Sequence, residues 1–160
     1  MKALVLAGSC SQVVLLELLK QRGIETVLAD NNVNAIARPN ADHFVKVDLL
    51  NAEAIKQVAI DLQVDFLITV CADQVLITVA KGSEELGLPC YIDYQTAQNV
   101  SDKKYMKRIF WENAIPTSKY LELDTLDWDK IEQLKYPMVI KPVDAYSSRG
   151  VRKVWNREEL

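Results

Sequence analysis

Short, largely apolar runs alternate with longer stretches of helical periodicity through the first hundred residues. The runs at 3–7, 26–29, 44–47 and 66–70 predict four buried strands, because a strand covered on both faces does not alternate apolar with polar residues. Helices are predicted at 11–20, after Asn51, and from Asp73 to Leu86, where Gly23 and Gly87 supply end signals. This alternation predicts an α/β fold with an open parallel sheet covered by helices.

The pattern changes near residue 100. Ser101 or Asp102 begins an amphipathic helix, and strands are then expected at 118–123, 137–141 and 151–155, with a short helix at 127–134. The chain stops within the first turn of a further predicted helix. We therefore expect a domain at 1–100 and the truncated beginning of a second domain at 101–160. The scattered tryptophans are expected to pack in the core: Trp111, Trp128 and Trp155.

Composition restricts the classes of partner. The chain has 160 residues, of which 49% are hydrophobic and 26% charged, and 19 Lys+Arg against 22 Asp+Glu give a net charge of −3. That balance predicts neither nucleic-acid nor membrane binding through bulk charge. No apolar run approaches the length of about 20 residues that spans a bilayer. Cys10, Cys71 and Cys90 show no metal or disulfide spacing, so we expect a cytoplasmic protein without a metal site in this chain.

Two loops at the expected carboxyl edge of the sheet deserve a functional test. Gly8 alone remains of the three glycines that a dinucleotide-binding loop uses, so Asp30, placed where an acid binds ribose, gives little support to a nicotinamide-dependent oxidoreductase. After the fourth strand, Cys71-Ala72-Asp73 either lines a substrate cleft or simply begins a helix.

The strongest chemical signal is Lys141, at the end of a predicted strand and followed by a loop of small residues up to Arg149-Gly150. A lysine held at a strand end suits phosphate oxygens, and backbone N–H groups of such a loop can cover a polyphosphate. These residues indicate a nucleotide-phosphate clamp, and an ordinary hairpin loop beside an edge lysine is the other interpretation.

Four segments in order resemble the opening of an ATP-grasp domain. They are Ser101-Asp102-Lys103-Lys104-Tyr105-Met106-Lys107, Ala114-Ile115-Pro116-Thr117, Tyr136-Pro137 through Lys141-Pro142, and Ser147-Ser148-Arg149-Gly150-Val151. The preceding hundred residues resemble the Rossmann-like pre-ATP-grasp domain of the biotin carboxylase and carbamoyl-phosphate synthetase branch. The resemblance covers essentially the whole chain.

This resemblance implies the N-terminal fragment of an ATP-dependent carboxylate–amine (or similar) ligase that acts through an acyl phosphate. It implies that Lys103 and Lys141 are nucleotide-binding lysines. If the alignment of the first motif is shifted by one residue, Lys104 takes the place of Lys103. It assigns Ser147, Ser148, Arg149 and Gly150 to the loop over the phosphates. No catalytic or metal-binding residue is expected in the chain itself.

For the full-length protein the resemblance implies ATP, Mg²⁺ and a small-molecule carboxylate, and a homo-oligomer is possible. No ligand is expected to bind tightly to the fragment. The alternative is a non-catalytic nucleotide- or metabolite-binding α/β module. A reading frame that continues past Leu160 would favour the ligase, and a natural stop codon there would favour the module.

Overall fold

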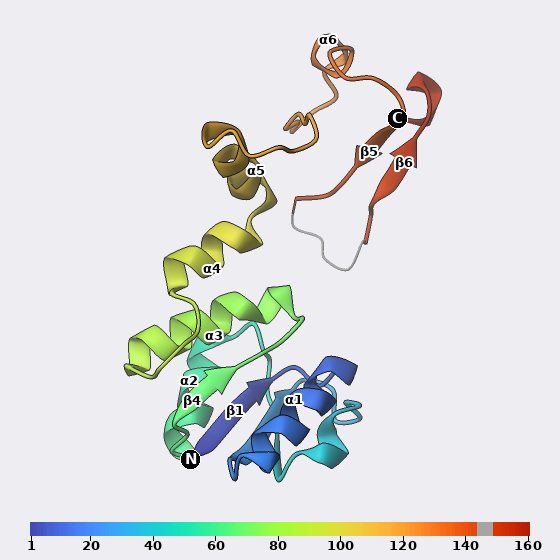
Figure 1. Cartoon of the computed structure of the whole chain (residues 1–160). Helices are drawn as coiled ribbons and strands as arrows, with labels where there is room; N and C mark the ends of the chain where they lie inside the picture. Colours follow the sequence, from blue (N-terminus) through green and yellow to red (C-terminus); the bar gives the residue numbers. More distant parts are fainter. Residues whose placement is uncertain (144–148) are drawn as a thin grey trace. The chain divides into compact units, whose positions relative to one another are not determined.

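The computed structural model describes residues 1–143 and 149–160. They form two compact units, Met1–Ser101 (unit 1) and Asp102–Leu160 (unit 2), and each is considered by itself (Figure 1). Among the described residues, no helix is both long and apolar enough to cross a membrane.

Unit 1 is built on a four-stranded parallel sheet. Its strands are β1 (Lys2–Leu6), β2 (Glu25–Asp30), β3 (His43–Lys46) and β4 (Phe66–Ile68), in the order β3-β2-β1-β4. Leu4 of β1 pairs with Val27 on one side and Leu67 on the other. The predicted open parallel sheet is confirmed, and β1 lies at its centre.

Helices cover both faces of this sheet (Figure 1). On one face, Leu16 and Leu19 of α1 (Cys10–Gln21) pack on Ala3, Val5 and Leu28. On the other face, α2 (Ala52–Asp61) and α3 (Asp73–Leu86) pack on the second set of strand side chains, which comprises Leu4, Leu6, Val27, Ala29 and Leu67. Because successive strand residues point to opposite faces and both faces are covered, β1 needs apolar residues at each position from Ala3 to Leu6.

Polar side chains fix the helix starts. The predicted cap at Asn51 is present, because its Oδ1 accepts a hydrogen bond from the Ala54 N–H at 3.1 Å. One further helix, α4 (Tyr94–Ser101), was not predicted from the sequence. Asp93 precedes it, and its Oδ1 accepts from the Thr96 N–H at 2.8 Å, which is the capping signal that would have found this helix.

A partly exposed polar contact fixes the start of β3 against β2. Asp42 Oδ2 accepts hydrogen bonds from the Thr26 N–H at 2.9 Å and the Thr26 hydroxyl at 2.8 Å, and Asp42 Oδ1 lies 2.9 Å from Lys20 Nζ. Chiefly because of the hydrogen bond from Lys20, the pKa of Asp42 is lowered from 3.8 to about 2.

This contact predicts an acid-sensitive contribution to stability. Since the pKa of Asp42 is lower in the folded state, its contribution is complete above about pH 4 and is lost as the pH falls toward 2. The side chain is 37% exposed, so solvent screening reduces the contribution to about 1 kcal/mol. Urea unfolding at about pH 5 and pH 3 should show that Asp42→Asn and Lys20→Met each lose most of it. Parent-like pH dependence in both variants would contradict the assignment.

Unit 2 contains α5 (Lys103–Glu112), α6 (Trp128–Ile131) and an antiparallel hairpin of β5 (Met138–Ile140) and β6 (Arg152–Val154), followed by a turn of 3₁₀ helix at Arg157–Glu159. Met138 pairs with Val154 and Ile140 with Arg152. The boundary at Asp102 coincides with the side-chain cap of α5.

Two expectations for unit 2 are wrong. Residues 118–123 do not form a strand, because β5 pairs only with β6 within the described residues and no other strand there offers hydrogen bonds. Trp111 and Trp155 lie outside the core, with 73% and 59% of their surface exposed. Lys153 Nζ lies 3.9 Å from the Trp155 ring centroid, an arrangement typical of an exposed aromatic side chain.

Candidate phosphate-binding site

The first candidate lysine is placed by the cap of α5. Asp102 Oδ1 accepts hydrogen bonds from the N–H groups of Lys104 at 2.8 Å and Tyr105 at 3.0 Å. These two bonds satisfy backbone donors that the first turn of a helix leaves unpaired. Lys103 is therefore the first residue of α5, at the helix end where partial positive charge accumulates.

A hydrogen bond joins α5 to the exit of β5. Lys103 Nζ donates to the Val143 carbonyl at 3.2 Å, across 40 residues of sequence. β5 ends at Ile140, so Lys141 and Pro142 lie in the segment that Lys103 reaches. Lys103 therefore contacts the backbone one residue beyond the second lysine-containing motif, a contact within unit 2 that neither motif alone predicts.

The two ends of the loop between β5 and β6 also meet. Gly150 has a φ of +69°, and a Cβ built on it would lie 2.7 Å from Pro142 Cγ. Only glycine fits such a close approach combined with a left-handed backbone. Arg149 therefore lies next to the point where this loop closes. The candidates Ser147 and Ser148 lie outside the described residues.

The other lysines of α5 reach different partners. Lys104 Nζ lies 3.7 Å from Asp124 Oδ1. Lys107 Nζ donates to the Ser118 hydroxyl at 3.0 Å, and it also contacts the Thr117 hydroxyl. Lys103 is thus the lysine of α5 whose ammonium contacts the segment after β5, which favours Lys103 over Lys104 for the first motif.

Lys103 contacts the segment that follows β5, and Lys141 and Arg149 lie in the sequence at the two ends of the β5–β6 connection; cations together with backbone donors can bind phosphate oxygens. Magnesium at a triphosphate requires carboxylate ligands. Across residues 1–143 and 149–160, no group of three His, Cys, Asp or Glu side chains is placed to hold a metal ion. The described residues therefore fit phosphate and do not fit a magnesium site.

The loop after β1 is closed to a dinucleotide. A Cβ built at Gly8 would lie 2.5 Å from the Ala35 Cβ and 3.1 Å from Asp30 Oδ2. Asp30 Oδ1 already accepts the Asn32 N–H at 2.7 Å, and the Ala37 N–H donates to the Gly8 carbonyl at 3.0 Å. The connection after β2 thus covers the space where a pyrophosphate would approach, which weighs against the oxidoreductase alternative.

A buried glutamine links the loops after β1 and β4. Gln12 is fully buried, its Nε2 donates to the Val70 carbonyl at 2.6 Å, and its Oε1 accepts from the Ser9 N–H at 3.1 Å. The Thr69 hydroxyl adds a bond to the Leu6 carbonyl at 2.8 Å. Gln12 was not among the residues singled out from the sequence, although Ser9-Cys10-Ser11-Gln12 has the spacing of a capping box, which is the signal that marks this residue.

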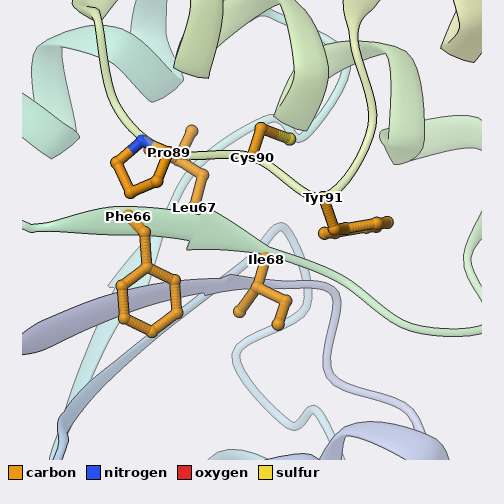
Figure 2. A pocket seen from close by; sticks show the side chains of 6 residues that line it. All are labelled: Phe66, Leu67, Ile68, Pro89, Cys90 and Tyr91. Carbon is orange, nitrogen blue, oxygen red and sulfur yellow. The ribbon is translucent and has the colours of Figure 1, made fainter.

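Two hollows are lined mainly by apolar side chains. The first, of about 230 Å³, lies beside β4, and Figure 2 shows its lining: Phe66, Leu67, Ile68, Pro89, Cys90 and Tyr91. The Tyr91 hydroxyl donates to the Thr69 carbonyl at 3.0 Å, and burial raises the pKa of Tyr91. The second, of about 340 Å³, is lined by Phe110, Trp111, Ala114, Ile115, Pro116 and Thr117. Lys103, Lys141 and Arg149 line neither hollow, so the candidate phosphate site is a separate surface.

Comparison with known proteins gives relatives over nearly the whole chain. The chain is 31% identical over 153 residues to the formate-dependent phosphoribosylglycinamide formyltransferase of Shewanella frigidimarina, covering 93% of the chain and 38% of that protein. It is 26% identical over 140 residues to the carbamoyl-phosphate synthase of Methanobrevibacter smithii, covering 84% of the chain and 38% of that protein. No protein-family model matches the chain.

The fold is also found in solved structures. The N5-carboxyaminoimidazole synthetase from Staphylococcus aureus complexed with ADP superposes with a TM-score of 0.84 at 17% identity, over 99% of this chain and 42% of that one. The similarity confirms the predicted fold class. The chain spans about two fifths of the length of the relatives it matches.

Proposed function

The chain is homologous to the amino-terminal part of ATP-grasp ligases, and from this premise we propose that it supplies part of the ATP phosphate site of a carboxylate–amine (or similar) ligase. The observation that carries the proposal is the hydrogen bond from Lys103 Nζ to the Val143 carbonyl at 3.2 Å. It places the lysine at the start of α5 beside the segment that contains Lys141.

The cations have a defined task in such a ligase. Transfer of the γ-phosphoryl group from ATP to a carboxylate oxygen gives an acyl phosphate and ADP, and attack by an amine then releases phosphate. Phosphoryl transfer depends on positioning and on neutralising charge at the phosphate oxygens. Lys103, Lys141 and Arg149 would hold those oxygens, while Ser147 and Ser148 belong to the same proposed loop. The carboxylate substrate and the magnesium ligands would involve other parts of the full-length protein.

A trapping experiment tests the reaction class. The full-length protein is incubated with ATP, hydroxylamine and a panel of small carboxylates, because hydroxylamine converts an acyl phosphate into a hydroxamate. Hydroxamate and ADP formed in equal amounts with one carboxylate would support the ligase. Nucleotide binding without ADP or hydroxamate across the panel would instead support the non-catalytic binding module.

Replacing each of the two neighbouring lysines by alanine tests the first phosphate contact. In the full-length protein, Lys103→Ala removes a charge-assisted hydrogen bond worth about 1.5–3 kcal/mol, so ATP affinity should fall about ten- to a hundred-fold. Lys104→Ala removes an exposed ion pair with Asp124, so ATP affinity should change far less. Calorimetric titration of ATP into both variants gives the comparison. A larger loss in Lys104→Ala would move the motif by one residue.

A further inference from the structure

The proposed phosphate site leaves the cysteines unused. Cys10, Cys71 and Cys90 are all free thiols and all exposed. Cys10 is the first residue of α1, directly after the turn that follows β1, and Cys71 comes three residues after the end of β4. Two of the three thiols therefore lie at the carboxyl edge of the unit 1 sheet, on the loops of two strands that are neighbours.

The pairing of these strands brings the two loops together. Val5 pairs with Ile68, the last residue of β4, so the segments after β1 and β4 leave the sheet from neighbouring positions. Neighbouring strands are about 4.8 Å apart, and a disulfide requires Cα atoms within about 7 Å. Cys10 lies only two residues beyond Gly8, where the chain turns into α1.

Hydrogen bonds join the two loops close to the cysteines. The Thr69 hydroxyl donates to the Leu6 carbonyl at 2.8 Å. Gln12 Nε2, two residues after Cys10, donates to the Val70 carbonyl at 2.6 Å, so the first turn of α1 is attached to the residue that precedes Cys71. The two thiols are therefore carried by segments that the fold itself holds at one place.

The backbone at Cys71 gives a separate argument. Its φ is +51°, in the left-handed region, which costs a residue with a Cβ about 1–2 kcal/mol and glycine almost nothing. The backbone alone would be better served by glycine. Ala7, Gln63 and Ala114 also adopt a positive φ, so the strain at Cys71 agrees with a use for its side chain but does not by itself assign one.

We propose that Cys10 and Cys71 are an oxidisable pair that forms a disulfide across the carboxyl edge between β1 and β4. A low-molecular-weight disulfide is the oxidant. The thiolate of one cysteine attacks it and releases one small thiol, and the second cysteine then attacks the mixed disulfide and releases the other. The protein loses two protons and two electrons, and the oxidant is reduced to two thiols.

The bridge would control access to this edge. Open α/β sheets bind ligands at the carboxyl ends of their strands, where neighbouring strands connect in opposite directions along the sheet. In the order β3-β2-β1-β4 that point lies between β1 and β4. A covalent bond between the loops would fix their separation, so oxidation would change binding at the edge without altering the phosphate site of unit 2.

Oxidation with glutathione disulfide, followed by alkylation and mass spectrometry of the intact chain and its peptides, tests the proposal. The reduced chain should take up three alkyl groups, one on each cysteine. After oxidation the chain should lose the mass of two hydrogen atoms and take up one alkyl group, at Cys90. A peptide containing both Cys10 and Cys71 should appear, and dithiothreitol should remove it.

Single replacements provide matched controls. Cys90→Ser should form the same bridge, whereas Cys10→Ser and Cys71→Ser should each retain glutathione on the remaining member of the pair. Repeating the oxidation in urea should abolish the preference for this pair, because the fold supplies the proximity. Alkylation of both Cys10 and Cys71 after oxidation, or bridges to Cys90 in equal amount, would overturn the proposal.

Discussion

Replacement of Lys141 by alanine is expected to weaken ATP binding to the full-length protein about ten- to a hundred-fold. The ammonium would donate a charge-assisted hydrogen bond to a phosphate oxygen, worth about 1.5–3 kcal/mol, and about 1.4 kcal/mol corresponds to each factor of ten. Lys141 follows the last residue of β5 and is exposed, so its removal should leave the unfolding temperature nearly unchanged. Calorimetric titration with ATP and thermal unfolding measure the two quantities.

Lys135→Ala is the matched control. Lys135 is also exposed and lies before β5, at the end of the strand opposite to the one that Lys103 contacts. Its loss should leave ATP affinity within about two-fold of the parent, because surface substitutions usually change free energies by less than about 0.5 kcal/mol. Equal affinities in Lys141→Ala and Lys135→Ala would refute the phosphate contact and leave Lys141 as the end of a strand.

Gly8→Ala should destabilise unit 1 by about 1–3 kcal/mol, the usual effect of overpacking a closely packed site. The added Cβ would lie 2.5 Å from the Ala35 Cβ, and real Cβ atoms do not approach so closely. For a unit of this size, each kcal/mol lowers the unfolding temperature by about 4–8 °C. Thermal unfolding followed by circular dichroism measures the change.

A second substitution tests the cause. Ala35→Gly removes the atom that the new methyl group meets, so the Gly8→Ala/Ala35→Gly double variant should unfold at a higher temperature than Gly8→Ala alone. The two sites are in contact, so their effects should not add. An unfolding temperature of Gly8→Ala equal to that of the parent would show that the connection after β2 does not pack on this turn.

The sheet of unit 1 could be predicted because its strands are buried on both faces. In β1 the residues Ala3 to Leu6 are fully buried. Each of these positions is therefore occupied by an apolar residue, and the apolar run in the sequence is unbroken. Asn51 and Gly87 likewise act locally, one as a side-chain cap and the other through a left-handed backbone at the helix end. Local interactions of this kind can be predicted from a single sequence.

Unit 2 was predicted less well, because strand formation depends on a partner. Residues 118–123 have suitable composition, but within the described part of unit 2 no strand pairs with them. The position of Trp111 shows the same limit, since an apolar residue is buried only where another element covers it. An apolar residue type indicates a preference for burial, but it does not indicate whether another element of the fold packs on that residue.

The sequence indicates which residues belong to the candidate site, but it does not indicate how they are arranged in space. The sequence singled out Lys103 and Lys141 by their contexts, whereas the contact of Lys103 with the segment after β5 is a bond to the Val143 carbonyl, 40 residues from Lys103. The Ser9–Gln12 capping box is a local signal in the sequence, whereas the bond from Gln12 to the Val70 carbonyl joins residues 58 apart and has no local signal. Because every residue has a backbone carbonyl, the residue type of the acceptor does not indicate that it accepts such a bond.

The central position of β1 bears on how the protein is made. Thr69, which bonds Leu6 across the β1–β4 pair, is 63 residues further along the chain. At about 5–20 residues per second, a ribosome needs roughly 3–13 s to extend the chain from one to the other. During that interval β1 can pair with β2 only, and its other hydrogen-bonding edge stays open. We expect nascent chains halted before β4 to engage chaperones that bind extended apolar segments, and to release them once residues 66–70 have left the ribosome.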